Sequence, residues 1–321
     1  MESTKGFKNV YDIIGDIHGE ALTLEHMLLS LGYEEGTEGF FHPERKAIFV
    51  GDFMDRGSEI IRGLSIVKKM VDHGNAYAIV GNHELNVIAF YTKDEDGIYL
   101  REHNLKNKTQ IKKSYEAFKT DNVTRKKYLK WLRSLPLFLE FDDFRVVHAC
   151  WDHDAIELLK KENPENRLSK RFLRRIYFER GKLFKATMLL LKGREFSLPG
   201  DLVLKDGYGF KRTAYRIKWW EPMNGKSFED ISYGNRFKLP NYNIPEQLCY
   251  DIPLYQKDEK PVFFGHYCMN EKAGVVRDNL CCVDGCVANG GSLIAYRWNG
   301  SRKLNQDRLI RVDRVKKSKV L

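Results

Sequence analysis

Residues able to bind a metal ion stand directly after short apolar runs in this sequence. The first case is residues 15–19 (GDIHG), where Asp16 and His18 follow the apolar residues 10–14. Carboxylate and imidazole groups are ligands of Mn²⁺, Fe, Zn²⁺ and Co²⁺, so this pair could provide half of a metal site. Taken alone it is weak support, because such residues are also common as hydrogen-bonded core residues.

The same arrangement recurs four times further along the chain. Residues 47–50 lead into GDFMDRG with Asp52, residues 77–80 into GNHE with Asn82, residues 144–147 into His148, and residues 261–264 into His266. Segments of helical period follow the first three of the five runs. Strand, loop and helix in repeated order predict parallel strands covered by helices, and the loops at the carboxyl ends of such strands share one edge. We therefore expect the six side chains to meet at that edge.

Six such ligands suffice for two metal ions, which Asp52 could bridge. Two ions lower the pKa of a bridging water, which then attacks a phosphoryl group held by the same ions. Mn²⁺ is the expected ion, with Fe, Zn²⁺ and Co²⁺ as alternatives. Arg56, in GDFMDRG, is suited to binding phosphate oxygens. His83 is suited to protonating the leaving oxygen, and Asp55 to holding the other ring nitrogen of His83.

Other segments must position these loops. Helical spacing predicts helices over residues 20–31 and 60–71, and a pair of amphipathic helices in the basic stretch 104–133. Three closing strands are predicted near the C-terminal end, with Asn299-Gly300 as a tight hairpin turn before the last one.

A long segment separates His148 from His266, and residues 167–182 within it are strongly basic. We interpret about residues 152–250 as an insertion or cap over the site, inside a single domain that spans residues 1–321. A solvated basic face is the plain interpretation of the charge in this segment.

Composition limits the possible partners. The formal net charge of +10 at pH 7 favours phosphate, nucleotides, nucleic acid or acidic protein surfaces. No apolar run approaches the ~18 residues of a membrane span, and residues 1–7 lack the apolar core of a signal peptide. We therefore expect a cytoplasmic protein without a membrane partner. Cys281, Cys282 and Cys286 are predicted to be buried free thiols, because the six cysteines lack the spacing of a secreted disulfide framework.

Together the motifs resemble the calcineurin-like metallophosphoesterases. The resemblance rests on residues 15–19, 51–57 (GDFMDRG) and 81–84 (GNHE), on His148 and on Gly265-His266, in this order. The DRG and NHE elements are similar to the phosphoprotein phosphatase branch, which includes serine/threonine phosphatases and symmetrical diadenosine tetraphosphatases. Residues 284–293 (DGCVANGGSL) resemble the closing segment of tetraphosphatase-like members.

The resemblance implies a four-layer α/β/β/α sandwich with a dinuclear metal centre. Asp16, His18 and Asp52 would hold the first ion, and Asp52, Asn82, His148 and His266 the second. His83 with Asp55 would form the acid pair, and Arg56 and Asn82 would contact the phosphate, with Tyr267 lining the pocket or packing beside it. No motif identifies the second phosphate-binding arginine of the family, for which Arg171, Arg174, Arg175 and Arg216 are candidates.

Two enzyme functions follow. The first is a metal-dependent phosphomonoester hydrolase, serine/threonine phosphatase-like, with phosphoprotein as one candidate substrate. The alternative is a symmetrical bis(5'-nucleosyl)-tetraphosphatase, for which Tyr208, Phe210, Trp219 and Trp220 could stack on two nucleotides. Charge alone leaves open a nucleic-acid-end or cyclic-phosphate phosphoesterase. A catalytically silent binding module is disfavoured, because no ligand residue is missing.

Overall fold

Two five-stranded sheets form the centre of the molecule. The computed structural model describes residues 10–197, 204–205, 211–212, 214–233, 239, 243–246 and 254–316. The first sheet has the spatial order β16 (Leu309–Asp313), β15 (Ser292–Trp298), β1 (Tyr11–Ile14), β4 (Lys46–Phe49) and β5 (Ala76–Ala78). The second has the order β13 (Gly274–Arg277), β14 (Leu280–Cys282), β12 (Val262–Phe264), β7 (Arg145–Val147) and β6 (Phe138–Glu140).

The strands that precede the candidate ligands are parallel. β1, β4 and β5 run parallel to one another, as their repeated strand, loop and helix order predicts. β7, β12 and β14 form a parallel group in the second sheet. The helices that follow β1, β4 and β5 are α1 (Ala21–Ser30), α2 (Ile60–Asp72) and α3 (Asn82–Tyr91). The five ligand loops therefore begin at carboxyl ends of parallel strands.

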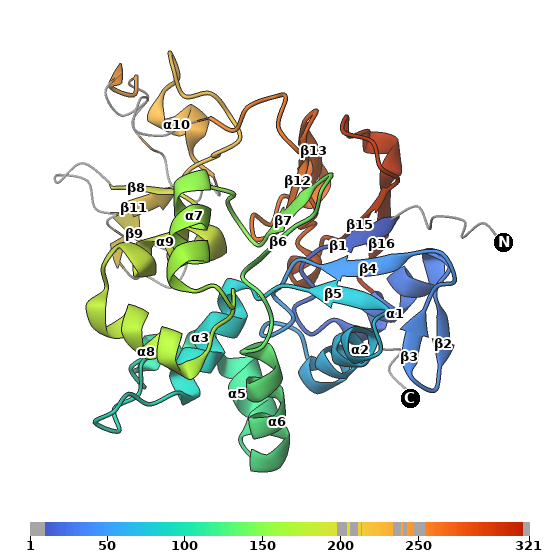
Figure 1. Ribbon diagram of the computed structural model, residues 1–321, viewed down its shortest axis with the longest axis vertical. Helices are drawn as coiled ribbons and strands as arrows, with labels where there is room; N and C mark the ends of the chain where they lie inside the picture. The colour runs from blue at the N-terminus through green and yellow to red at the C-terminus, as the bar shows by residue number, and fades with distance from the viewer. Residues whose placement is uncertain are drawn as a thin grey trace, which may run out of the picture.

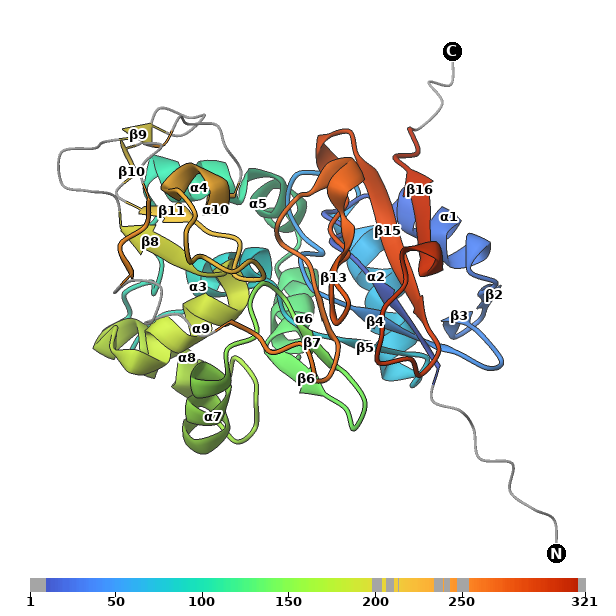
Figure 2. The same ribbon diagram turned by 90° about the horizontal axis from the view of Figure 1, so that it is seen from above.

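Side chains that alternate along each strand build the layers. Ile13 of β1 and Ile48 of β4 pack in one core cluster with Val146 of β7 and Phe263 of β12, between the two sheets. The residues next to them in each strand point to the opposite face of the sheet, where they pack in the cluster that includes the helices. Figure 1 shows α1 and α2 on the side of β4 and β5 that faces away from the second sheet, and Figure 2 shows α7 to α9 on the other side of the molecule, beyond the second sheet. The predicted α/β/β/α sandwich is confirmed.

The outer layer over the second sheet comes from the segment predicted as a cap. Its described elements are α7 (His153–Glu162), α8 (Lys170–Glu179), α9 (Lys182–Lys192), β8 (Glu195–Ser197), β9 (Leu204–Lys205), β10 (Lys211–Arg212), β11 (Ala214–Arg216) and α10 (Phe228–Ile231). Trp219 Nε1 donates to the Ala149 carbonyl at 2.9 Å, and its ring centroid lies 5.1 Å from that of Phe264 on β12. This contact ties the segment to the second sheet, while its capping role stays a prediction. Tyr208 and Phe210 lie outside the described residues.

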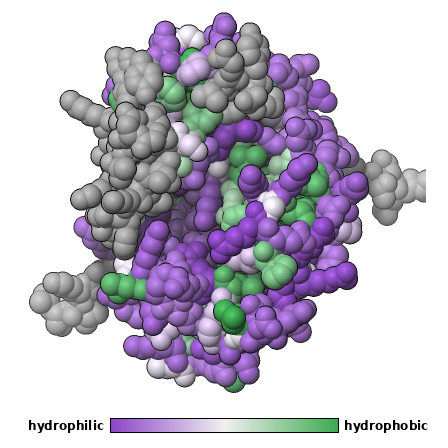
Figure 3. Space-filling model, turned by 90° about the vertical axis from the view of Figure 1, so that its left-hand side faces the viewer, coloured by the Kyte–Doolittle hydropathy of each residue, from purple (hydrophilic) through white to green (hydrophobic). Residues whose placement is uncertain are grey.

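The side of the molecule on which α8 and α9 lie, at the left of Figure 1, is mostly hydrophilic (Figure 3). Arg171, Arg175 and Arg180 of this region are exposed, and Arg175 pairs with Glu162 and Glu179. The exposure of these arginines agrees with the interpretation of the basic residues 167–182 as a solvated face.

Two local predictions were wrong. The basic stretch 104–133 forms three helices, α4 (Leu105–Gln110), α5 (Lys112–Phe118) and α6 (Asn122–Leu132). Asn104 and Asp121 each accept a backbone N–H where α4 and α6 begin, and a turn at Ile111 separates α4 from α5. Asn299-Gly300 is not a two-residue hairpin. Residues 299–308 form a longer loop with a 3₁₀ turn (Gln306–Arg308), in which Trp298 Nε1 donates to the Ser301 carbonyl.

The remaining elements are short. They are the paired strands β2 (Glu34–Gly36) and β3 (Gly39–Phe41), which form a short hairpin, and the 3₁₀ turns Asn270–Lys272 and Val287–Asn289. Among the helices of the described ranges, none is long and apolar enough to cross a membrane.

Candidate metal centre

The loop after β1 places His18 against the loop after β4. His18 has a left-handed backbone (φ 47°), and its Nδ1 donates to the Met54 carbonyl at 2.8 Å. This bond fixes the ring and leaves Nε2 free to face Asp52, whose Oδ2 lies 3.6 Å away. Burial lowers the pKa of His18 well below its usual value, and the nearby Arg56 guanidinium lowers it further. His18 is therefore a neutral imidazole, as a metal ligand must be.

Asp52 lies at the centre of the cluster. Its backbone is also left-handed (φ 52°), and Oδ1 accepts the backbone N–H of His83 at 2.9 Å. The same oxygen lies 3.4 Å from His148 Nε2. Burial alone would raise the pKa of Asp52, but the neighbouring histidines, His148 first, lower it well below its usual value. An ionised carboxylate between two groups of histidines is suited to bridging two cations.

Asn82 and His148 meet on the second-sheet side of Asp52. The Asn82 carboxamide, at the start of α3, has its Oδ1 3.1 Å from His148 Nε2. His148 is fully buried, and its Nδ1 donates to the Val50 carbonyl at 2.8 Å, so that Nε2 points into the cluster. This bond to the Val50 carbonyl orients the ring in the way usual for metal-ligating histidines.

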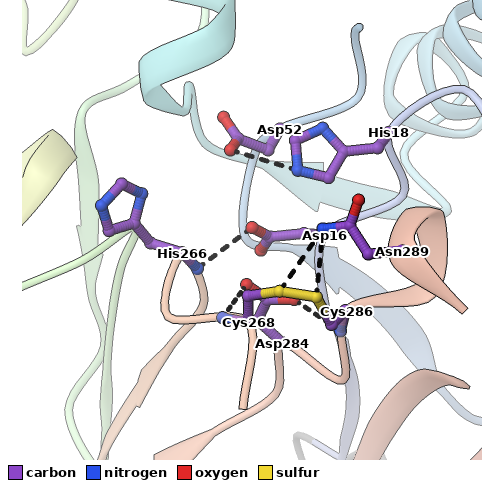
Figure 4. The surroundings of a disulfide bond; sticks show 8 residues. All are labelled: Asp16, His18, Asp52, His266, Cys268, Asp284, Cys286 and Asn289. Atoms are coloured by element: carbon purple, nitrogen blue, oxygen red, sulfur yellow. Dashed lines mark hydrogen bonds and ion pairs between the residues drawn. A yellow bond between two sulfur atoms is a disulfide. The ribbon is translucent and has the colours of Figure 1, made fainter. Parts of the chain in front are cut away.

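Asp16 and His266 complete the cluster from opposite sheets (Figure 4). Asp16 Oδ2 accepts the backbone N–H of His266 at 3.0 Å. The other carboxylate oxygen, Asp16 Oδ1, and His266 Nε2 are both buried without a hydrogen-bond partner among the described residues. Burial raises the pKa of Asp16, and the Asp284 and Asp52 carboxylates raise it further. Buried acceptors that lack a hydrogen-bond partner and lie among carboxylates are suited to binding a cation.

The donor set therefore fits two metal ions. Ligand atoms of His18, Asp52 and His83 lie within 4.8 Å of one another, and those of Asp52, His148 and His266 do so too. Asp52 belongs to both groups, as expected for a bridging residue. In the first group His83 takes the place that the resemblance assigns to Asp16. The structure thus brings the six candidate ligands together, but it does not group Asp16 with His18.

His83 and Asp55 are in contact, as expected for the predicted acid pair, and their catalytic role stays a prediction. His83 Nδ1 lies 2.7 Å from Asp55 Oδ2. Burial would lower the pKa of His83, but the Asp52 and Asp55 carboxylates raise it. The hydroxyl of Ser114, on α5, donates to the other Asp55 oxygen and accepts the Asp55 N–H at 3.0 Å. Ser114 was not predicted, because it stands far from the motifs in the sequence.

Glu84 is a further residue for which no role was predicted. Its buried carboxylate accepts backbone N–H groups from Asp52, Phe53, Met54 and Gly81. One side chain thus holds the loops after β4 and β5 together. In the sequence, only its place in the GNHE motif points to this role.

Arg56 and Arg216 flank the ligand cluster. Arg56 is exposed and lowers the pKa of His18. Burial lowers the pKa of His266, and Arg216 lowers it further. Arg216 Nε is buried without a hydrogen-bond partner, and its guanidinium lies 5.6 Å from the centroid of the Tyr267 ring. Arg174 instead donates to the Lys93 carbonyl. Arg216 is therefore the best placed of the four candidate arginines.

Tyr267 does not face open space. It is 0% exposed, and its ring packs against Trp220, Tyr233 and Phe264. Its hydroxyl finds no hydrogen-bond partner in the described parts of the chain. Packing is the role that the geometry supports, and substrate contact stays a prediction.

The prediction of a free Cys286 was wrong. Cys286 forms a disulfide with Cys268, directly beside the metal centre (Figure 4). Asp284 accepts the backbone N–H groups of both cysteines and so holds the two loops in place. Cys281 and Cys282 are buried free thiols, as predicted. The pairing joins loops from two strands, which spacing along the chain does not reveal.

Comparison with known proteins places this chain in a wider group. The profile of the calcineurin-like phosphoesterase family matches residues 11–295. A symmetrical bis(5'-nucleosyl)-tetraphosphatase of Vibrio campbellii is 26% identical over 305 residues, which cover 92% of this chain and 98% of the relative. An asymmetrical bis(5'-nucleosyl)-tetraphosphatase of Oceanobacillus iheyensis is 32% identical over 139 residues, covering 43% of this chain and 54% of the relative. This second match thus spans about half the length of that relative.

Among solved structures, a serine/threonine phosphatase of Saccharomyces cerevisiae with similarity to human phosphatase PP5 is similar in fold. The TM-score is 0.50 at 16% sequence identity, covering 99% of this chain and 84% of that chain. At this identity the likeness supports the fold alone.

Proposed function

Because the chain belongs to the calcineurin-like phosphoesterase family, whose members are metal-dependent phosphoester hydrolases, we propose that its substrates are dinucleoside polyphosphates, cleaved symmetrically. The observation that supports this choice is the match along 98% of a relative named as a symmetrical tetraphosphatase. It favours the function that the sequence motifs ranked second.

Two divalent ions, which we propose to be Mn²⁺, would supply the positive charge that activates water and stabilises the attacked phosphoryl group. Asp52 would hold both ions, with His18 and Asp16 on one side and Asn82, His148 and His266 on the other. Here the assignment of Asp16 follows the family pattern.

The protein's own side chains would orient the substrate. Arg56 and Arg216 lie on the flanks of the cluster without a carboxylate partner in the described residues, so both can bind phosphate oxygens with charge-assisted hydrogen bonds. Arg216 belongs to β11, and it is through this strand that the long segment between His148 and His266 would reach the substrate.

Product analysis tests the proposal. Metal-stripped protein reloaded with Mn²⁺ should convert diadenosine tetraphosphate into two molecules of adenosine diphosphate. Asp52→Asn should abolish turnover, while Asp72→Asn, which removes an exposed carboxylate paired with Lys68 on α2, should leave it unchanged. Formation of adenosine mono- and triphosphate, or full activity of Asp52→Asn, would contradict the proposal.

Phosphomonoester hydrolysis, for example on phosphoprotein, is the second candidate. The 2.7 Å contact between His83 and Asp55 favours it, because a serine alkoxide needs a proton on leaving, whereas a nucleoside diphosphate leaves readily as an anion. His83→Asn should therefore reduce phosphopeptide turnover far more than turnover of diadenosine tetraphosphate. Rapid phosphopeptide hydrolysis with no cleavage of diadenosine tetraphosphate would establish this candidate instead.

A further inference from the structure

The loop after α3 folds back along that helix and carries Arg101. Lys93 and Tyr99 form a bridge in this loop, and the Arg101 backbone N–H donates to the Ala89 carbonyl at 3.2 Å. The Arg101 guanidinium reaches the Asn86 carboxamide, three positions earlier on the helix. The side chain therefore points along α3 toward its first residue.

That direction leads to the metal centre. Asn86 lies four positions after Asn82, so both side chains are on one face of α3, with Cβ atoms roughly 5–6 Å apart. Asn82 Oδ1 is the atom that lies 3.1 Å from His148 Nε2. Burial lowers the pKa of Arg101, while Tyr177 and the Asp55 carboxylate act in the opposite direction, which places Arg101 within electrostatic reach of the acid pair.

The charge of Arg101 is not neutralised. Its NH1 and NH2 groups donate only to the neutral carboxamides of Asn86 and of Gln110 on α4. Its Nε is buried without a hydrogen-bond partner, and no carboxylate in the described ranges forms an ion pair with it. Arg45 and Arg194, which are also shielded from solvent, pair with Asp12 and Asp152. A partly buried guanidinium without an anion is costly unless a ligand supplies one.

We propose that Arg101, positioned by Asn86 and Gln110, binds a second phosphoryl group of the substrate, adjacent in a phosphoanhydride chain to the one under attack. The proposal rests on the proposed function. One helical turn separates Asn86 from Asn82, a span that a phosphoanhydride chain can bridge. Bound in this way, Arg101 would hold the part of the chain next to the attacked phosphoryl group and would select polyphosphates over simple monoesters.

Inhibition by inorganic anions tests this without a nucleotide substrate. Hydrolysis of an activated aryl phosphate would be measured with orthophosphate or pyrophosphate as competitor, at a fixed excess of free Mn²⁺. The wild-type protein should bind pyrophosphate more tightly than orthophosphate. Arg101→Gln should lose about tenfold to a hundredfold in pyrophosphate affinity, the range for loss of charge-assisted hydrogen bonds, and much less in orthophosphate affinity.

Arg125→Gln is the matched control. Arg125 also donates to a neutral carboxamide, that of Asn122, and lies over the Tyr91 ring, but it is on α6. This variant should keep the preference for pyrophosphate. An unchanged preference in Arg101→Gln, or equal losses for both anions, would overturn the inference. If the preference depends on Arg101 but diadenosine tetraphosphate is not cleaved, only the proposed function fails.

Discussion

Replacement of Glu84 by glutamine should destabilise the fold and displace Asp52. The carboxylate accepts the N–H groups of Asp52 (2.8 Å) and Gly81 (2.9 Å) on Oε2, and those of Phe53 (2.9 Å) and Met54 (3.2 Å) on Oε1. Glutamine offers one acceptor oxygen, so one pair of N–H groups would face the amide NH₂ instead. Glu84→Gln therefore removes two charge-assisted hydrogen bonds and leaves two buried donors unpaired.

The size of the effect follows from those two bonds. Each hydrogen bond to a charged group contributes about 1.5 to 3 kcal/mol, which gives about 3 to 6 kcal/mol for the pair. Burial, and then the Asp52 carboxylate, raise the pKa of Glu84 to about 7, so the ionised form is only partly populated near neutral pH. We therefore expect Glu84→Gln to lower the unfolding free energy by about 3 kcal/mol, the lower end of this range.

Urea unfolding of the chelator-treated protein measures this loss apart from metal binding. Glu157→Gln is the control, because Glu157 is exposed and its pair with Lys160 is a surface salt bridge worth about 0 to 1 kcal/mol. At saturating Mn²⁺ the Glu84→Gln protein should also turn over more slowly, since Asp52 is no longer held. A loss under about 1 kcal/mol with normal turnover would refute the idea that Glu84 organises the two ligand loops.

Three other substitutions test neighbouring contacts. Ser114→Ala should cost about 1 to 3 kcal/mol of unfolding free energy, because it leaves the Asp55 carboxylate and N–H without their hydroxyl partner. It should also slow phosphopeptide turnover more than turnover of an activated aryl phosphate. Equal slowing of both reactions would show that Ser114 does not act through the acid pair. Replacing Cys268 and Cys286 together by serine opens a loop of 18 residues and should cost about 3 kcal/mol, so dithiothreitol should shift urea unfolding of the wild type but not of the variant. Identical shifts in both proteins would contradict the disulfide. Tyr267→Phe should change neither stability nor kcat/KM, because the hydroxyl has no hydrogen-bond partner in the described residues, whereas a large rise in KM would support its predicted contact with substrate.

The meeting of the candidate metal ligands at one edge was predictable because each candidate is a local signal. A ligand that directly follows a buried strand is fixed at the sheet edge by the strand itself, and the parallel order of β1, β4 and β5 was readable from the repeated pattern. What the pattern did not predict is how the backbone turns there. His18, Asp52 and His266 all have left-handed backbones, a conformation that non-glycine residues adopt when surrounding contacts enforce it. Glu84 supplies such contacts for Asp52, and these bonds are visible only once the two loops are side by side.

The substrate side of the site was harder to predict because charge density along the chain is a poor guide to phosphate binding. The conspicuous run in residues 167–182 lies on a solvated surface, where Arg175 is balanced by Glu162 and Glu179. Arg101 stands beside Glu102 in the sequence and looks neutralised, yet Glu102 accepts a hydrogen bond from Asn104 instead. A guanidinium that lacks a carboxylate in three dimensions is the better indicator, because only that group gains a new partner when an anionic substrate binds.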